Sequence, residues 1–553
     1  MRMANRTALR AIACIAALAL LPIIPYAVYG YAGQDFESHV TAWLALRTAW
    51  LAGDLTPMWN PQANFGLGDV HLGLYPPGAI YAGGVLAMLM PLRYVPGFFV
   101  WIVTALSGAA MYFACREFVA QRDRLAAAIL YMLSPYLVTT ALVRFAAGEL
   151  LVQMMLPLIL LCFYRVVWQR EWRSMWLLAG LLGISWFTNV PESVALFYTL
   201  LIVAAICGWM QRSVGPVLRM LAVEAVAGAL AAFYLAPLWV ERQWINVPRL
   251  ARIDPQRLLL FMPYTGAGVE ALKVFKYSCW LFACVNMLLL IACWWKRTQP
   301  FCDASAARMW SYLAMVAFFF QLPIAAVLWH HLPQIGLAQY PFRFQPVMGA
   351  AVPLLLLAAG TRVSLRWPAY FVIGAMTLVP LLEHARTQMT ASTRMPRFAE
   401  LERGWTTIGY EGMPEFVPLG VTRPAGPLGM PATTVVDAAA GSSCSVTAAT
   451  AEADAVRFVA LSSAPCSVRV AVYSYPYWNV IDQNGAMLPH TVDSDHMLVV
   501  QVPAGEHRVH ALFQPRSAIR TISRTVSIAA WLVTLCFLLR AGTVSSRFRP
   551  TGA

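Results

Sequence analysis

The chain has 553 residues, of which 59% are hydrophobic and only 12% are charged, and its mean hydropathy is +0.61. This composition excludes a soluble globular domain and is typical of a membrane protein with many spans. The formal charge of +14 is dispersed in short basic clusters between apolar runs, which argues against a nucleic-acid partner. Most of the eleven cysteines lie inside apolar runs and no CxxC motif occurs, so a zinc site or a cysteine scaffold is not indicated.

Apolar runs long enough to cross a bilayer as helices predict twelve spans. The first follows Arg2, Arg6 and Arg10, and we interpret it as an uncleaved span rather than a signal peptide. The predicted spans are residues 8–27, 97–115, 125–142, 149–167, 174–188, 191–210, 217–239, 276–295, 309–328, 346–361, 367–383 and 525–541.

A thirteenth apolar run, residues 78–92, is short, rich in glycine and preceded by Pro76 and Pro77. If it does not cross, the basic clusters that begin at Arg116, Arg165 and Arg212 all fall on the cytoplasmic side, as the positive-inside rule requires. We therefore expect 78–92 to be a re-entrant or interfacial segment, and both termini to be cytoplasmic.

This topology predicts four regions. Residues 1–383 form a transmembrane domain, in which 31–96 are the first outer loop and its continuation. Residues 384–431 have no periodicity and are rich in Pro, Gly and Met, which indicates a linker. Residues 432–523 show period-two runs such as VRFVAL and HMLVVQV, which predict a small antiparallel β domain outside the membrane. Residues 524–553 form a final span and a cytoplasmic tail.

The first outer loop gathers ionisable residues in a chain that is otherwise poor in them. Asp35 follows the first span directly, and Glu37 and His39 come next. In a helix Asp35 and His39 share a face, so His39 could orient the carboxylate or join it as a metal ligand. Asp69 and His71 could complete such a site, and a divalent metal ion is one option these residues allow. Alternatively, Asp35 simply caps a helix that starts near Phe36.

Several stretches together resemble a known group of membrane proteins. They are GQDFESH (33–39), WNPQANFGLGD (59–69), LYPPGAIY (74–81), SPYLVTTALVRFAAGELL (134–151), FTNVP (187–191), AQYPFRF (338–344), YSYPYWNVIDQNG (473–485) and VPAGEHRV (502–509). In this order they resemble bacterial members of the GT-C superfamily of glycosyltransferases. That group includes proteins named after a 6-pyruvoyl-tetrahydropterin synthase-related domain and proteins that glycosylate lipoteichoic acid. The resemblance covers nearly the whole chain.

The resemblance implies a GT-C-like helical fold in the bacterial inner membrane. It also implies transfer of a sugar from a polyprenyl-phosphate donor to an acceptor of the cell envelope, on the outer face. GT-C enzymes place a catalytic Asp or Glu just past the first span, which makes Asp35 the expected general base. Membership would not decide whether a metal is needed, because some GT-C enzymes require a divalent cation and others do not.

Arg144 and Arg343 are candidates to bind the donor phosphate, because a guanidinium offers a fork of donors to phosphate oxygens. Arg144 could instead pair with Glu149, and Arg343 could extend to lipid head groups. Glu149, Asn189 and Glu192 are expected to support these groups from behind.

In the β domain, Cys444 and Cys466 form a candidate disulfide. Nothing in that domain indicates catalysis, so we expect it to bind the acceptor or brace the outer loops. A transporter or flippase of lipid-linked glycans and a noncatalytic envelope-assembly protein remain alternative functions. A transporter would place its ionisable residues at mid-membrane in paired repeats, whereas here they lie at the outer ends of spans.

Overall fold

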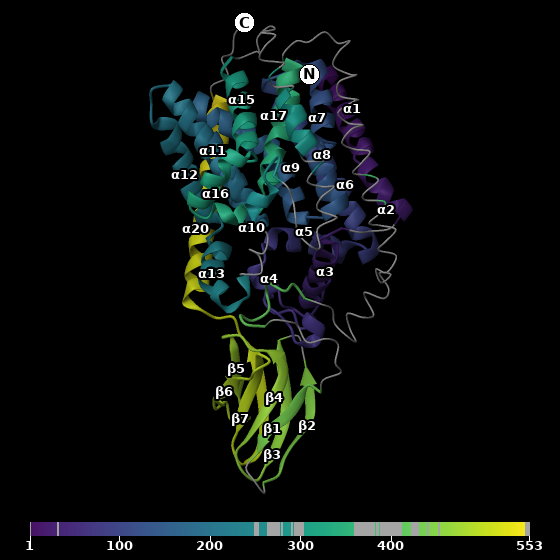
Figure 1. Cartoon of the computed structure of the whole chain (residues 1–553), viewed down its shortest axis with the longest axis vertical. Coiled ribbons are helices and arrows are strands. Elements are labelled where there is room, and N and C mark those ends of the chain that lie inside the picture. Colours follow the sequence, from purple (N-terminus) through teal and green to yellow (C-terminus); the bar gives the residue numbers. More distant parts are fainter. Residues whose placement is uncertain are drawn as a thin grey trace.

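The computed structural model describes residues 2–29, 33–247, 254–262, 277, 280–288, 291, 304–358, 382, 386, 412–421, 431–438, 442–451 and 454–547. A long helical body is joined at one end to a β domain (Figure 1). Helix α1 (Arg2–Leu18) begins, and helix α20 (Ala518–Arg547) ends, toward the end of the body that lies farthest from the β domain. The far end of the first span, just before Asp35, therefore lies nearer the β domain.

Six described segments are long and apolar enough to cross a membrane: Arg6–Val28, Leu92–Glu117, Gln121–Arg144, Ala147–Gln169, Val190–Met210 and Ala518–Arg540. Two helix pairs pass the same test only as bent units. They are Gly215–Leu230 with Ala232–Trp244, bent by 77°, and Ser305–Phe319 with Pro323–His331, bent by 79°. The described residues thus hold six to eight candidate spans, and the predicted count of twelve is not confirmed.

The remaining predicted runs explain the difference. Runs 174–188 and 346–361 form α10 (Trp172–Thr188) and α17 (Gln345–Ala358), which have 17 and 14 residues. Run 276–295 is described only in part, and run 367–383, apart from residue 382, lies outside the described residues. The run at 78–92 forms α5 (Pro77–Leu89), whose 13 residues reach about 20 Å at a rise of about 1.5 Å per residue. This length is short of the roughly 30 Å hydrocarbon core.

Two large apolar cores hold the helical body together, and a smaller one lies among α1, α6 and α7. The first large core lies among α3, α5, α6, α8 and α9, and the second among α6, α7, α9, α10, α11, α12, α15 and α17. Helices α6 and α9 contribute to both large cores, and α9 lies near the middle of the body (Figure 1). The other helices are α2 (Ile24–Tyr29), α3 (Phe36–Leu51), α4 (His71–Leu74), α6 (Val95–Ala114), α7 (Arg124–Met132), α8 (Pro135–Thr139), α9 (Ala147–Tyr164), α11 (Val190–Met210), α12 (Gly215–Leu230), α13 (Ala232–Glu241), α15 (Ala304–Phe319) and α16 (Ala326–His331).

The β domain contains two antiparallel four-stranded sheets, ordered β1-β4-β7-β6 and β2-β3-β8-β5. Alternate residues of the strands are buried between the sheets, as in β4, where Val468 and Val470 are inside. The predicted antiparallel domain is therefore confirmed. The strands are β1 (Thr433–Ala438), β2 (Cys444–Ala451), β3 (Ala455–Ser462), β4 (Cys466–Tyr473), β5 (Trp478–Ile481), β6 (His490–Val492), β7 (Met497–Val502) and β8 (Gly505–Phe513).

The β domain packs directly on the first outer loop. The Trp59 ring lies against the rings of Trp478 and Phe513, with centroids 5.2 and 5.0 Å apart. The backbone N–H of Tyr473 donates to the carbonyl of Leu67 over 2.7 Å. Loop and β domain therefore share one apolar core, so the domain braces the loop that carries Asp35.

A disulfide joins Cys444 on β2 to Cys466 on β4. These strands belong to different sheets, so the bond ties the two sheets together across the sandwich. Within its own sheet β2 pairs with β3, and β4 pairs with β1 and β7.

We predict that replacing Cys444 and Cys466 by serine lowers the stability of the β domain by about 2–4 kcal/mol, because the unfolded segment gains conformational freedom. Thermal unfolding of the purified protein with and without reductant measures the effect. Cys536→Ser, which removes a free exposed cysteine, should leave the transition unchanged. An equal transition temperature for the double variant and the wild type would contradict the prediction.

Candidate functional site

Arg144 lies in a π-helical turn, Thr140–Arg144, that follows α8. The next residue, Phe145, takes left-handed backbone angles (φ 51°, ψ 42°) before α9 begins at Ala147. The Phe145 ring packs edge-on against Phe36, with ring centroids 4.9 Å apart. A wider turn of this kind re-aims side chains and is frequent at functional sites.

The backbone before α3 is pinned to this turn. The N–H of Asp35 donates to the carbonyl of Arg144 over 2.8 Å, and the N–H of Gln34 donates to that of Val143 over 3.1 Å. A Cβ at Gly33 would lie 2.6 Å from the Cβ of Phe145, so only glycine allows this close approach. Asp35 is therefore held beside Arg144 by the main chain.

Asp35 occupies the N-cap position of α3, but its side chain makes no capping hydrogen bond. Its Oδ2 instead lies 4.0 Å from Nη2 of Arg144, and 38% of the side chain is exposed. The capping interpretation is thus not supported. A carboxylate that is free of structural bonds, accessible and next to a guanidinium is available for chemistry.

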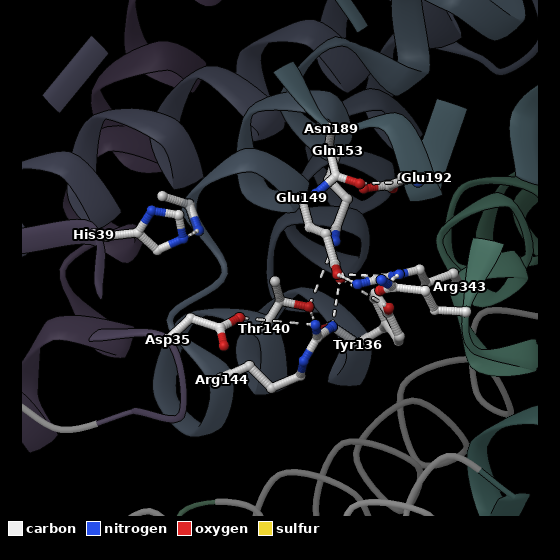
Figure 2. Close-up of polar contacts among 12 residues, drawn as sticks. Asp35, His39, Tyr136, Thr140, Arg144, Glu149, Gln153, Asn189, Glu192 and Arg343 are labelled. Carbon is white, nitrogen blue, oxygen red and sulfur yellow. Dashed lines mark hydrogen bonds and ion pairs between the residues drawn. The ribbon is translucent and has the colours of Figure 1, made fainter. Parts of the chain in front are cut away.

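Glu149 is the buried centre of the cluster (Figure 2). Its Oε2 accepts hydrogen bonds from Nη1 of Arg144 at 2.6 Å and from the hydroxyl of Tyr136 at 3.1 Å. Its Oε1 accepts from Nε of Arg343 at 2.9 Å and lies 2.8 Å from Nη2 of the same residue. The Arg144–Glu149 ion pair, which the sequence offered as the alternative to phosphate binding, is present, and Arg343, distant in sequence, also pairs with Glu149.

Arg144 and Arg343 differ in which guanidinium nitrogens already donate to protein acceptors. Nη1 of Arg343 donates to the carbonyl of Ala338 at 3.0 Å and to Oε1 of Gln339 at 2.6 Å, while its other nitrogens face Glu149. Arg144 uses Nη1 for Glu149 and turns Nη2 toward Asp35. Arg144 is therefore better placed than Arg343 to receive a ligand.

Asn189 and Glu192 form the start of α11 behind the cluster. Oδ1 of Asn189 accepts from the backbone N–H of Glu192 at 2.9 Å and so caps the helix. The Glu192 side chain is 1% exposed, and within the described chain neither carboxyl oxygen has a hydrogen-bond partner. Figure 2 places it on the far side of Glu149 from Asp35.

The other predicted residues of the first loop do not converge on Asp35. Nε2 of His39 accepts from the backbone N–H of Ala147 at 3.3 Å, so this ring supports the start of α9. Asp69 and His71 form their own buried pair, with Oδ1 and Nδ1 2.7 Å apart. Glu37 is exposed in the first turn of α3, where a negative charge favours the helix dipole.

The metal hypothesis is not supported by this arrangement. Within the described ranges, no three His, Cys, Asp or Glu side chains are spaced to hold a metal ion. Atoms His71 Nε2 and Asp69 Oδ2 are buried and unpartnered in the described chain, but Nε2 of His39 is already occupied by the backbone of α9.

Three residues of the site were not predicted: Tyr136, Gln339 and Glu415. Tyr136 and Gln339 are uncharged: the hydroxyl of Tyr136 donates to Glu149, 13 residues on, and Gln339 accepts from Arg343, four residues on. Glu415 belongs to the predicted linker. Burial raises its pKa, and the negative charges of Asp35 and Asp69 raise it further. An acidic residue in a stretch without periodicity gives no signal of its position.

The pKa values of the first loop follow from burial. Desolvation raises the pKa of Asp35 above its ordinary value, while the Arg144 guanidinium opposes this shift. Burial lowers the pKa of His39 to about 4, and the nearby His71 contributes in the same direction. His39 is therefore neutral at physiological pH, as the hydrogen bond that its Nε2 accepts requires.

No protein-family model matches the chain, and no curated protein matches its sequence. Solved structures of the oligosaccharyltransferase from Archaeoglobus fulgidus align with it. The complex with Zn and sulfate has 14% identity and a TM-score of 0.39, over 75% of this chain and 59% of that chain. The complex of AglB from this archaeon with an inhibitory peptide and a dolichol-phosphate has 12% identity and a TM-score of 0.42, over 75% and 61%. The chain thus spans about three fifths of these proteins. Likeness at this level assigns neither a family nor an activity.

We predict that Glu149→Gln destabilises the protein by about 3–5 kcal/mol, because it leaves two buried guanidinium groups without their carboxylate. Unfolding of the detergent-purified variant measures the loss. Glu171→Gln is the matched control, because Glu171 is 38% exposed and lies 3.7 Å from Arg165. Equal losses for the two variants would mean that Glu149 does not hold the cluster.

A second prediction concerns pH. His39 titrates near 6.5 when unfolded but near 4 when folded, so only the unfolded chain gains this proton as pH falls from 6.5 to 4. The contribution of His39 to the free energy of unfolding should therefore be fully present above pH 6.5. It should fall by up to about 3 kcal/mol as the pH drops from 6.5 to 4. The wild type and His39→Asn, which cannot titrate there, are compared by unfolding at each pH. Identical pH slopes would contradict the assignment.

Proposed function

We propose that this protein is a membrane glycosyltransferase of GT-C type in the bacterial inner membrane. It moves a sugar from a polyprenyl-phosphate donor to an acceptor of the cell envelope. In this proposal twelve spans place both termini in the cytoplasm and the site outside. The distribution of basic clusters supports this orientation, as does the start of α1 at the end of the body farthest from the β domain (Figure 1).

The observation that carries the proposal is the pairing of Asp35 with Arg144. A partly exposed carboxylate and a guanidinium with a nitrogen left to donate lie 4.0 Å apart. Arg144 ends a candidate span, and Asp35 lies at the start of α3, seven residues beyond the end of the first candidate span. Sugar transfer from a lipid phosphate needs these two groups, a base for the acceptor proton and a cation for the departing phosphate. Ionisable groups at membrane depth are costly and usually mark a site.

The proposed step is a direct displacement with inversion. The acceptor hydroxyl attacks the anomeric carbon of the sugar and passes its proton to the carboxylate of Asp35. The bond from the anomeric carbon to the phosphate oxygen breaks, and the lipid phosphate leaves with the bonding electrons. Arg144 stabilises the charge on this leaving group through its Nη2.

Glu149 and Arg343 serve as the support of this pair. The bond from Nη1 of Arg144 to Glu149 fixes the plane of the guanidinium, so its Nη2 points to the side where Asp35 lies. Arg343 neutralises the second oxygen of Glu149 and is itself held by Gln339. Such preorganisation lowers the reorganisation needed when charge develops on the phosphate.

We predict that Asp35→Asn lowers sugar transfer at least about 100-fold, because the base is lost while the shape is kept. Purified protein with a labelled polyprenyl-phosphate sugar measures the rate. Because the base acts when ionised and its pKa is raised, wild-type activity should fall as pH drops toward that pKa. Asp54→Asn is the control, since Asp54 is exposed in the same loop and accepts a hydrogen bond from the backbone N–H of Thr56.

Two results would overturn the proposal. Asp35→Asn could transfer sugar as fast as the wild type, in which case Asp35 is not the base. Wild-type protein could move the lipid-linked sugar across the bilayer without transferring or hydrolysing it, which would favour the transporter.

A further inference from the structure

A second site lies at the opposite end of α11. A cavity of about 630 Å³ opens between the last turns of α11 and the first turn of α12. Helix α11 starts beside the Glu149 cluster and has 21 residues, so its last turn lies roughly 30 Å away at about 1.5 Å per residue. The cavity is thus about one hydrocarbon thickness from the candidate active site.

The cavity has an apolar floor and a polar rim. Ala205 and Gly208 of α11 and Val217 of α12 contribute small or aliphatic walls, and Trp209 stands beside them with 82% of its surface exposed. Arg212 and Ser213 line the same space from the connecting turn. An apolar cleft flanked by an exposed Trp and a cation is the composition of a membrane–water interface.

The turn is built to present Arg212. The backbone of Arg212 has a positive φ angle of 49°. The N–H of Ser213 donates to the carbonyl of Gly208 over 2.9 Å. A Cβ at Gly208 would lie 2.8 Å from the carbonyl oxygen of Ser213, so glycine permits this tight turn. In the described part of the chain, none of the ion pairs involves Arg212.

The charge around the cavity is one-sided. Arg219 lies near Arg170, a like charge, and its Nε and Nη2 donate to the carbonyls of Val166 and Val167 over 3.0 and 3.2 Å. Arg212 is the cation of this group that lines the cavity. Exposed Val214, Leu218 and Leu221 continue the apolar surface along α12.

We propose that this cavity binds one anionic phospholipid, with its phosphate on Arg212 and its acyl chains along the apolar face between α11 and α12. Charge complementarity favours a lipid of net negative charge, because the described residues that line the cavity include one cation, Arg212, and no acidic residue. The apolar floor favours a lipid over a free anion, since inorganic phosphate would leave that surface uncovered.

The site does not depend on the proposed glycosyl transfer. It would anchor the α11–α12 hairpin at the membrane surface opposite to the catalytic cluster. Since Asn189 caps α11 and Glu192 lies in its first turn, a lipid at the other end stabilises the same helix that supports the cluster.

Native mass spectrometry of the full chain with phosphatidylglycerol, compared with phosphatidylethanolamine, tests this proposal. Arg212→Asn removes the guanidinium and keeps a residue that tolerates left-handed angles. We expect about tenfold weaker retention of one phosphatidylglycerol, as for a lost charge-assisted contact, and recovery in Arg212→Lys. Arg122→Asn is the control, because Arg122 is 82% exposed and does not line the cavity.

A second variant blocks the cavity by a different change, so that a folding defect of one variant cannot be mistaken for loss of lipid binding. Ala205→Trp fills the floor and should displace the lipid while Arg212 remains. Equal retention of phosphatidylglycerol by Arg212→Asn, Ala205→Trp and the wild type would overturn the proposal. Stabilisation of the wild type by inorganic phosphate as strong as that by phosphatidylglycerol would also overturn it, because the site would then bind a free anion.

Discussion

One buried carboxylate, Glu149, determines the arrangement of the site. Two buried guanidinium groups would be unstable in the apolar interior without it, because an unpaired buried charge costs several kcal/mol. Glu149 accepts from Arg144 in the turn before α9 and from Arg343 in the turn before α17. The ion pairs therefore join segments 194 residues apart and hold them at the same end of the helical body. Asp35 is free to act because Arg144 already has its structural partner.

The site is also held from outside the membrane. Trp59 and Leu67 of the first loop pack on the β domain, and the N–H of Asn246 donates to the carbonyl of Val417 over 3.1 Å. A second buried ion pair joins Glu241 of α13 to Arg520 of α20. The hydroxyl of Tyr477, in the β domain, donates to Oε1 of Glu241 over 2.7 Å. The β domain is thus fixed to two helices as well as to the loop.

Sequence predicted the features that depend on local pattern. The helical body, the antiparallel strands, the position of Asp35 after the first span and the Arg144–Glu149 pair all follow from periodicity or from residues close in the chain. It did not predict that Arg343 shares Glu149, that His39 supports α9, or that Glu415 lies near Asp35. These contacts depend on packing between distant segments. Hydropathy measures length along the chain and does not show where a helix ends. Among the twelve predicted spans, two are divided by bends of 77° and 79°, two form helices of 17 and 14 residues, and runs 276–295 and 367–383 lie largely outside the described residues.

The central claim is that Asp35 and Arg144 face the phosphate of a lipid-linked sugar. An experimental structure of the protein with a bound polyprenyl phosphate tests it most directly. The account predicts a phosphate oxygen within hydrogen-bond distance of Nη2 of Arg144, with the carboxylate of Asp35 facing the position of the sugar. A phosphate bound away from Arg144, with the ion pairs of Glu149 intact and Asp35 turned from the lipid, would contradict it.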